Sequence, residues 1–237
     1  MGATDHNSIL MTKAENPRPK TIETAAIVLA AGRSERMGAF KPLLPFGKTT
    51  VIEACIENLR AGGVETIVVV VAQDLRGEKL QRHLHDSEVT FAINQDPASE
   101  MGDSIACGAR QLSGQTRAVL ITPADHPAVP REVVAQLIEE WQKGAALVVP
   151  TFENRGGHPV LLDISFRPEL LKLDPHRGLK KLFQVHSATV SRLAVKSKYI
   201  ARDMDTWDDY RVLHEEVFGV SPPEALDYSS KGSKQGT

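Results

Sequence analysis

The sequence predicts an α/β protein with a single domain, in which a mostly parallel central sheet forms the middle of a three-layer α/β/α arrangement. Short apolar runs alternate along the chain with longer segments of helical period, the pattern of strand–helix units in a doubly wound sheet. Several runs are continuously apolar, as expected of strands covered on both faces. The length of 237 residues suits one such domain. Polar segments at residues 1–22 and 220–237 are expected to be flexible tails around a domain at residues 23–219.

Six apolar runs are candidate strands. They cover residues 25–31, 67–72, 89–93, 118–121, 146–149 and 159–162. In open sheets of this kind, ligands bind beyond the carboxyl ends of the strands. We therefore expect the functional residues in the loops that follow Ala31, Ile93, Ile121 and Val149.

Three further segments have the spacing of amphipathic helices. The first starts at a capping box formed by Thr50 and Glu53 and stops at Gly62. The second stops at Gly144, and the third starts at Thr206. The positions expected to face the core are Ile52, Cys55, Ile56 and Leu59 in the first helix, Val134, Leu137, Ile138 and Trp141 in the second, and Tyr210, Leu213 and Val217 in the third.

Composition argues against several classes of function. The net charge of −2 provides no global basic field that would recruit nucleic acid or an anionic membrane. The apolar run at residues 25–31 is too short to cross a bilayer, and the N-terminal residues lack the apolar core of a secretory signal. Cys55 and Cys107 form neither a CxxC pair nor a disulfide framework, which indicates a reducing, cytoplasmic setting.

The loop after the first apolar run is rich in glycine and in cations, and reads LAAGRSERMGAFKP. Gly32 and Gly38 permit the turns of a loop whose N–H groups point at phosphate oxygens. Arg33, Arg36 and Lys41 add three cations within nine residues, and both residue types bind phosphate. A solvated basic loop would contain the same cations, but their place directly after a buried strand favours phosphate binding.

Two aspartates lie where a hard cation could be held. Asp125 follows the run at residues 118–121 and precedes Pro127, and Asp205 directly precedes Thr206. Mg²⁺ in proteins is often bound through one or two carboxylates together with substrate phosphates. Taken alone, a turn-forming role would account for Asp125, and a favourable interaction with a helix N-terminus would account for Asp205.

The segment LAAGRSERMGAFKPLLPFG resembles the signature of the MobA-like nucleotidyltransferases, and within that family it is closest to the molybdenum cofactor cytidylyltransferases. The resemblance covers roughly residues 25–218, by the span of the matching motifs. It implies a GT-A-like (Rossmann-like) fold, a nucleoside triphosphate and Mg²⁺ at the site, and pyrophosphate as product. Ala30, Ala31 and Gly32 match the cytidylyl form, whereas guanylyl relatives typically have Ala-Gly-Gly there, which favours CTP.

The resemblance also implies roles for individual residues. Asp125 matches the family's Asp-x-Pro magnesium motif, and Asp205 matches the second aspartate of its Asp-x-Asp-Thr motif, which leaves Asp203 either a structural role or one in supporting the metal ligand. The nucleotide-binding positions are Leu29, Ala30, Ala31, Gly32, Arg33, Lys41, Asn94 and Ser104; the catalytic positions are Arg36, Lys41 and Asp125; the metal ligands are Asp125 and Asp205; and the acceptor contacts are Gly157, His158 and Arg177.

One loop departs from the family's pattern. The segment NQDPASEMGDS at residues 94–104 resembles the nucleotide and acceptor loop, in which the family commonly has Gly-Met-x-x-Ser. Glu100 stands at the glycine position. Its charge would oppose an anionic acceptor unless the side chain points away or binds the cation.

The function implied by the resemblance is Mg²⁺-dependent transfer of CMP from CTP to a phosphorylated acceptor, Mo-molybdopterin, with release of pyrophosphate. The product would pass to a molybdenum hydroxylase, directly or through a chaperone. Four alternatives remain open: GTP as donor, a sugar phosphate or choline phosphate as acceptor, a non-catalytic nucleotide-binding protein, and an oxidoreductase, since some relatives are described as redox enzymes. The sequence contains no GxGxxG fingerprint of a dinucleotide-binding site.

Overall fold

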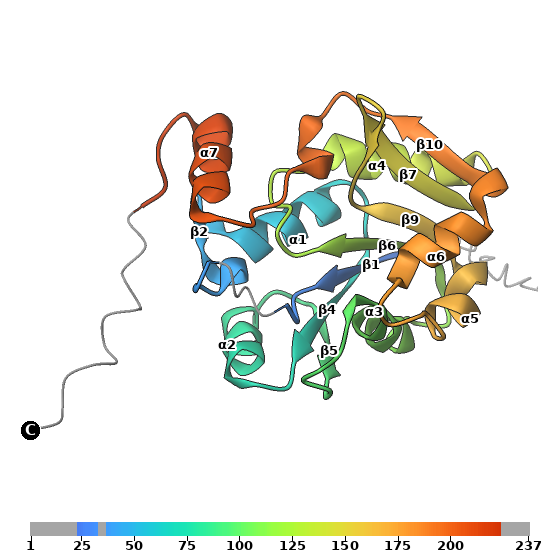
Figure 1. The fold of residues 1–237 in the computed structure, drawn as a ribbon, viewed down its shortest axis with the longest axis horizontal. Helices are drawn as coiled ribbons and strands as arrows, with labels where there is room; N and C mark the ends of the chain where they lie inside the picture. The colour runs from blue at the N-terminus through green and yellow to red at the C-terminus, as the bar shows by residue number, and fades with distance from the viewer. Residues whose placement is uncertain (1–22, 33–36, 224–237) are drawn as a thin grey trace, which may run out of the picture.

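The centre of the structure is a mixed, mostly parallel sheet of eight strands (Figure 1). The computed structural model describes residues 23–32 and 37–223. Along the sheet the strands follow the order β10-β7-β9-β6-β1-β4-β5, and β8 pairs with β7. The strands are β1 (Glu23–Leu29), β4 (Thr66–Ala72), β5 (Thr90–Asn94), β6 (Thr116–Pro123), β7 (Leu147–Phe152), β8 (Arg155–Gly156), β9 (Val160–Asp163) and β10 (Val190–Ala194). All six predicted strands are present; β9 runs antiparallel to β6 and β7.

Helices cover both faces of the sheet, so the predicted three-layer α/β/α arrangement is confirmed. The helices are α1 (Val51–Ala61), α2 (Leu75–His83), α3 (Met101–Arg110), α4 (Arg131–Gln142), α5 (Arg167–Leu170), α6 (Gly178–Val185) and α7 (Trp207–Phe218). Buried residues of α1, α2 and α4 join one core cluster with the sheet, and buried residues of α3, α5 and α6 join a second. No helix in the described part of the chain is both long enough and apolar enough to span a membrane.

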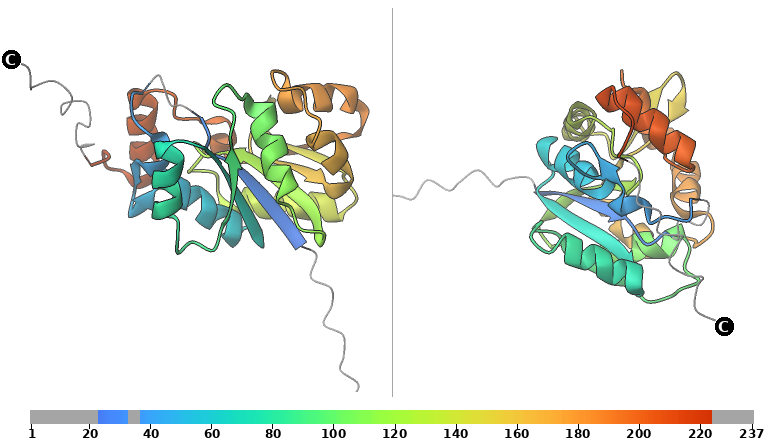
Figure 2. Two further views of the ribbon diagram at one scale, coloured as in Figure 1. Left: turned by 90° about the horizontal axis from the view of Figure 1, so that it is seen from below. Right: turned by 90° about the vertical axis from the view of Figure 1, so that its left-hand side faces the viewer.

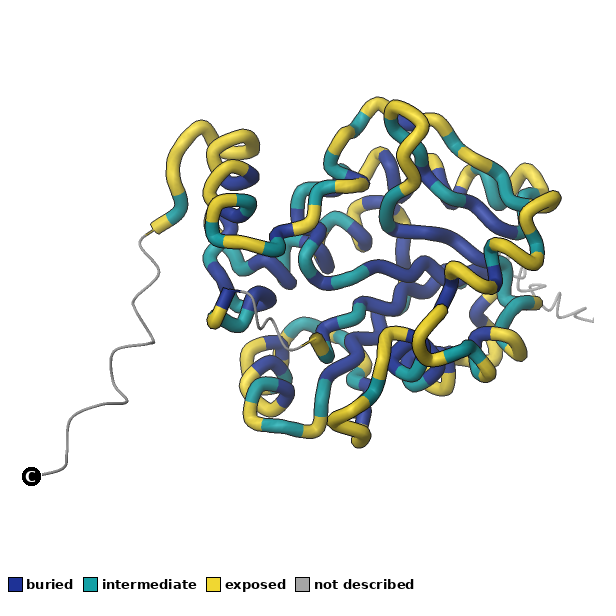
Figure 3. The backbone as a smooth tube through the Cα atoms, viewed as in Figure 1, coloured by how far each residue is buried: buried dark blue, intermediate teal, exposed yellow. Residues whose placement is uncertain are grey.

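Strand β1 shows why the apolar runs are continuous. Ala26 and Val28 belong to one core cluster, whereas Ala25 and Ile27 belong to the other, and all four are fully buried. Successive side chains of a strand point to opposite faces, so a strand covered on both sides needs an apolar residue at every position. Figure 3 shows the strands as the buried centre of the molecule and the connecting loops as its exposed rim.

A third, smaller core lies at one end of the molecule, beneath α7. The hairpin of β2 (Pro45–Phe46) and β3 (Thr49–Thr50) packs there against α7, which stands at the opposite end from α6 (Figure 1, Figure 2). The hydroxyl of Tyr210 donates to the carbonyl of Pro45 at 2.6 Å.

The inward face of α7 differs from the predicted one at a single position. Tyr210 and Leu213 are buried as predicted, but Val217 is 37% exposed and His214 is buried instead. His214 is satisfied on both nitrogens: Nδ1 lies 2.7 Å from the carbonyl oxygen of Val220, and Nε2 accepts from the N–H of Gly47 at 3.3 Å. The spacing of the helix favours an apolar residue such as Val217 at a buried position. It cannot show that both ring nitrogens of His214 find hydrogen-bond partners, which is what allows His214 to be buried.

The connections place three strand ends side by side. Strand β1 pairs in parallel with β4 on one side and β6 on the other, and β4 pairs in parallel with β5. The chain therefore winds in opposite directions from β1, which makes the carboxyl end of β1 a topological switch point. At that end the N–H of Ala124 donates to the carbonyl of Leu29 at 3.0 Å, so the residue after Ala124 lies next to the loop that follows β1.

Candidate active site

A cleft of about 1220 Å³ opens at the switch point. Nine residues predicted to form the nucleotide and metal sites line it: Leu29, Ala30, Ala31, Gly32, Lys41, Asn94, Ser104, Asp125 and Asp205. Arg33 and Arg36 were also predicted there, but they lie outside the described residues. The structure thus brings together side chains from segments that are more than 160 positions apart in the sequence.

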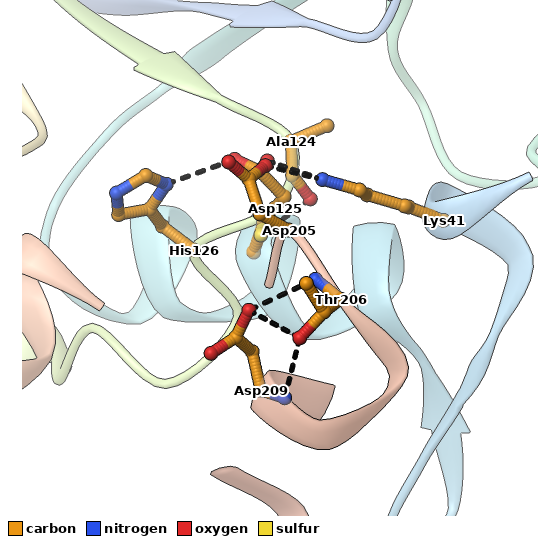
Figure 4. A network of polar contacts seen from close by, with 8 residues as sticks. Lys41, Ala124, Asp125, His126, Asp205, Thr206 and Asp209 are labelled. Carbon is orange, nitrogen blue, oxygen red and sulfur yellow. Dashed lines mark hydrogen bonds and ion pairs between the residues drawn. The ribbon is translucent and has the colours of Figure 1, made fainter. Parts of the chain in front are cut away.

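At the centre of the cleft, one ammonium group bridges two carboxylates (Figure 4). The Nζ of Lys41 lies 2.8 Å from Oδ1 of Asp205 and 3.5 Å from Oδ2 of Asp125. Lys41 begins the short 3-10 helix η1 (Lys41–Leu43), Asp125 follows β6, and Asp205 precedes α7. The other oxygen of Asp125, Oδ1, lies 3.0 Å from Nδ1 of His126.

The environment of Asp125 keeps its carboxylate ionised. Burial by itself would raise the pKa of Asp125, but the hydrogen bond and charge of His126 and the ammonium of Lys41 outweigh burial and lower it below its usual value. Lys41 is itself only 9% exposed, so its charge is poorly screened by solvent. Asp125 is therefore ionised at neutral pH and available to bind a cation.

The two carboxylates fit a magnesium site that the substrate completes. Within residues 23–32 and 37–223, no three His, Cys, Asp or Glu side chains are grouped closely enough to hold a metal ion by themselves. Mg²⁺ is typically held by one or two carboxylates together with water and substrate phosphates. Asp125 and Asp205 offer the two carboxylates of such a site. The ammonium of Lys41 lies between these carboxylates, which shows that one positive charge can be held by both at once.

The charge of the cleft also favours binding of a divalent cation. Among the described residues that line it, the carboxylates are Asp74, Asp96, Glu100, Asp125 and Asp205, and the cations are Lys41 and Arg76. This excess of negative charge would repel a nucleoside triphosphate. A nucleotide therefore needs a divalent cation, cations from outside the described residues, or both.

Arg76 is a cation at the cleft that the sequence did not single out. Its Nη2 lies 2.7 Å from Oδ2 of Asp74. Asp74 in turn caps α2 by accepting from the N–H groups of Arg76 and Gly77 at 3.0 and 2.9 Å. The signal that could have found Arg76 is its place in the first turn of α2, which follows the end of β4 at the same edge of the sheet as the loop after β1.

The loop after β5 is shorter than predicted, because α3 begins at Met101. Glu100 is the N-cap of α3, and it forms a capping box in which its N–H donates to Oδ2 of Asp103 at 3.0 Å. This gives the unusual residue at the family's glycine position a structural role. Asn94, predicted to bind nucleotide, uses its side-chain amide to brace the same loop, donating to the hydroxyls of Ser99 and Ser104 at 2.9 and 3.1 Å.

The three residues predicted to contact the acceptor are absent from the cleft lining that the structure describes. Arg177 is exposed, and its Nη2 donates to Oε1 of Gln184 at 3.0 Å. It directly precedes α6, and its side chain bonds to that helix. His158 packs against His126, with its ring edge-on to that of His126 at a centroid distance of 5.2 Å and 73° between the ring planes.

Gly157 lies in close contact with the chain's own backbone. A Cβ at this position would lie 2.2 Å from the carbonyl oxygen of Ile200, whereas a Cβ at the neighbouring Gly156 would meet only a methyl of Val149, at 3.3 Å. The family resemblance placed Gly157 at the acceptor. The structure shows that the close approach at Gly157 is made by the 3-10 helix η4 (Lys198–Ala201).

We expect Gly157→Ala to lower the free energy of unfolding by about 1–3 kcal/mol, because the backbone must shift to admit the methyl group. Gly156→Ala is the matched control and should change it by less than about 0.5 kcal/mol. Urea unfolding monitored by circular dichroism measures both. Equal effects of the two substitutions would contradict this reading of Gly157.

Comparison with known proteins finds one family and several curated relatives. The sequence profile described as a MobA-like NTP transferase domain matches residues 26–190. The chain is 25% identical over 191 residues to the molybdenum cofactor cytidylyltransferase of Escherichia coli K12, across 80% of this chain and 94% of the relative. It is 31% identical over 182 residues to a probable molybdenum cofactor guanylyltransferase of Methanosarcina mazei, across 73% and 80% of the two chains.

Two further relatives extend the range of described activities. The chain is 24% identical over 197 residues to the nicotine blue oxidoreductase of Paenarthrobacter nicotinovorans, across 79% of this chain and 95% of the relative. It is 31% identical over 138 residues, or 56% of this chain, to the bifunctional protein GlmU of Geobacter sulfurreducens, but it spans only 28% of the length of that protein.

Solved structures show the same fold. The crystal structure of Rv0371c from Mycobacterium tuberculosis H37Rv matches with a TM-score of 0.71 at 25% identity, across 81% of this chain and 97% of that chain. A second structure of that protein, described as a complex with manganese, matches with a TM-score of 0.68 at 26% identity, across 81% and 98%.

Proposed function

The chain belongs to the MobA-like NTP transferase family, and from this membership we propose that it is a Mg²⁺-dependent cytidylyltransferase that transfers CMP from CTP to Mo-molybdopterin. The observation that carries the proposal is the meeting of Lys41, Asp125 and Asp205 at one point of the cleft, beside the loop after β1. A nucleotide-binding protein without catalysis would need the loop but would not need two carboxylates around one cation position.

The proposed reaction requires positioning and charge neutralisation from the protein. A phosphate monoester on the acceptor is already anionic near neutral pH, so its attack on the α-phosphorus of CTP needs neither a general base nor a covalent enzyme intermediate. Lys41, with Arg36, stabilises the departing pyrophosphate, and Asp125 with Asp205 would hold the metal. A bound magnesium ion would supply charge neutralisation to the phosphate oxygens of the nucleotide.

CTP as donor rests on the form of the loop after β1. Ala30 and Ala31 line the cleft and match the cytidylyl form of the signature. GTP is the second candidate donor, because a relative described as a probable guanylyltransferase is 31% identical to this chain. The roles of Gly157, His158 and Arg177 toward the acceptor remain predictions.

The proposal includes a cellular setting. We place the enzyme in the cytoplasm, in keeping with Cys55 and Cys107, which are both unpaired thiols. The transferase domain spans residues 23–219. Its product would be handed to a molybdenum hydroxylase, directly or through a chaperone.

Calorimetric titration with CTP, GTP, ATP and UTP, each with Mg²⁺ and again with EDTA, tests the proposal. We expect metal-dependent binding with preference for CTP, because the cleft needs added positive charge to accept a triphosphate. Preference for GTP would move the donor assignment to guanylyl transfer and leave the mechanism intact. Absence of binding by any triphosphate, with or without metal, would contradict the proposed function, and a visible absorbance of the purified protein would favour a redox role.

A further inference from the structure

We propose that His126 is a positioning residue for the reaction: its imidazole fixes one oxygen of Asp125, so that the other oxygen faces the cation position, and His158 supports the imidazole from behind. This inference rests on the proposed function, because it concerns the metal site of that function. The motifs of the family give His126 no role, and they imply that His158 contacts the acceptor.

The two oxygens of Asp125 have different partners. Oδ1 lies 3.0 Å from Nδ1 of His126, and Oδ2 lies 3.5 Å from the ammonium of Lys41 (Figure 4). Because an ionised carboxylate can only accept, the ring proton belongs on Nδ1, which donates to Oδ1. A carboxylate held through one oxygen cannot rotate freely about its own axis, so Oδ2 stays directed at the cation position.

The imidazole is itself held in place. The side chain of His126 is only 7% exposed, against 23% for that of Asp125. The ring of His158 meets it edge-on, at 5.2 Å between centroids. His158 is anchored through its own backbone, because its N–H donates to the carbonyl of Ile200 at 2.8 Å and the preceding Gly157 leaves no room for a side chain.

His158 is suited to support the ring of His126 by packing, because its own ring carries no charge at neutral pH. Burial, and to a lesser extent the neighbouring His126, lower the pKa of His158 to about 4, so its ring is neutral at pH 7. Its Nδ1 is buried and has no hydrogen-bond partner among the described residues. A neutral ring beside His126 leaves the hydrogen bond to Asp125 undisturbed, and His158 is not among the described residues that line the cleft.

The competing explanation is that His126 only fills space, and three substitutions at this position separate the two. Asn places its amide nitrogen close to the position of Nδ1 and can still donate to Asp125. Gln extends its amide nitrogen towards the position of Nε2, and Leu fills the volume without a donor. Positioning predicts that only Asn preserves the site, whereas space filling predicts that Leu and Gln serve at least as well as Asn.

The experiment is a titration of the full chain with Mn²⁺ in the presence of CTP, with free Mn²⁺ measured by electron paramagnetic resonance. We expect His126→Asn to bind Mn²⁺ within about 3-fold of the unmodified protein. His126→Leu and His126→Gln should bind about 10–100-fold more weakly, the usual effect of losing a group that orients a metal ligand. In transfer assays these two variants should need about 10–100-fold more Mg²⁺ for half-maximal turnover, whereas His126→Asn should not. His158→Ala should weaken Mn²⁺ binding in the same direction but less.

The outcomes distinguish this inference from the function on which it rests. If the unmodified protein binds no Mn²⁺ with any triphosphate, the proposed function is wrong, and this inference fails with it. If the unmodified protein binds Mn²⁺ and His126→Leu binds it equally well, the role of His126 is wrong while the function stands. Thermal unfolding shows which variants are folded, and if the Leu variant is not, the comparison of Asn with Gln decides.

Discussion

Asp125→Asn should abolish transfer without unfolding the protein. The substitution keeps the shape of the side chain and an oxygen that can accept from His126, but it removes the charge that faces the cation position. We expect turnover to fall by about 10³-fold, the upper range for loss of one preorganised electrostatic group. Release of pyrophosphate from CTP and acceptor measures the loss, and thermal unfolding checks that the fold is kept.

Asp203→Asn is the matched control for this loss. Asp203 is exposed and does not belong to the described lining of the cleft, although it lies only two positions from Asp205. Its substitution should leave turnover within about 3-fold of that of the unmodified protein, because surface substitutions away from the core and from bound groups usually have small effects. Full Mg²⁺-dependent activity in Asp125→Asn would show that the metal site has been placed on the wrong carboxylate.

Lys41→Met should have two opposite effects. Turnover should fall by about 10²–10³-fold, because a cation that stabilises the departing pyrophosphate is lost. Binding of Mn²⁺ without nucleotide should become at least about tenfold tighter, since a pair of unit charges 4 Å apart near a protein surface interacts by on the order of 4 kcal/mol. The reason is that the ammonium of Lys41 occupies the same two carboxylates, at 2.8 and 3.5 Å, that a metal ion would use.

A pair of Mn²⁺ titrations without nucleotide measures the second effect. Lys48→Met serves as control, because Lys48 carries the same charge but is exposed in the turn of the β2–β3 hairpin. It should change neither turnover nor Mn²⁺ binding. Unchanged Mn²⁺ binding in Lys41→Met would mean that this ammonium does not compete with the metal.

The fold could be predicted from the sequence where burial is complete and could not where it is partial. Strands covered on both faces appear as continuous apolar runs, and all six were found. Strand β10 was missed because it lies at the sheet edge, where its residues are half-buried or exposed and include Ser191 and Arg192. Helix α2 was missed because only Gly77 and Leu80 of its residues are buried.

Helix α3 was missed for a different physical reason. Its segment contains Gly102 and Gly108, and glycine in a sequence usually indicates a loop. In the structure these glycines permit close packing: a Cβ at Gly108 would lie 2.6 Å from Ile27, and one at Gly102 would lie 2.5 Å from the carbonyl of Asp174. Such contacts depend on segments that are distant in the sequence, so local pattern cannot reveal them.

Some residues of the candidate site could be predicted from the sequence and others could not. Lys41, Asp125 and Asp205 were predicted because each follows a strand or precedes a helix in a motif of the family, and the structure brings them together. His126 carries no spacing signal, since its importance comes from the direction of one ring nitrogen. The location of His158 likewise follows from the packing of η4, which no motif encodes.

The position of Asp205 depends on a core that the sheet does not share. Met204, next to it, is buried with Phe46, Tyr210 and Leu213 in the cluster beneath α7, and none of these residues belongs to the two clusters on the sheet. A small core of this kind can open as a separate cooperative unit while the larger cores remain intact. Such opening would withdraw one carboxylate and leave Asp125 at the end of β6. Denaturant should therefore inactivate the enzyme before it melts the sheet, and amide hydrogens of α7 should exchange earlier than those of β1.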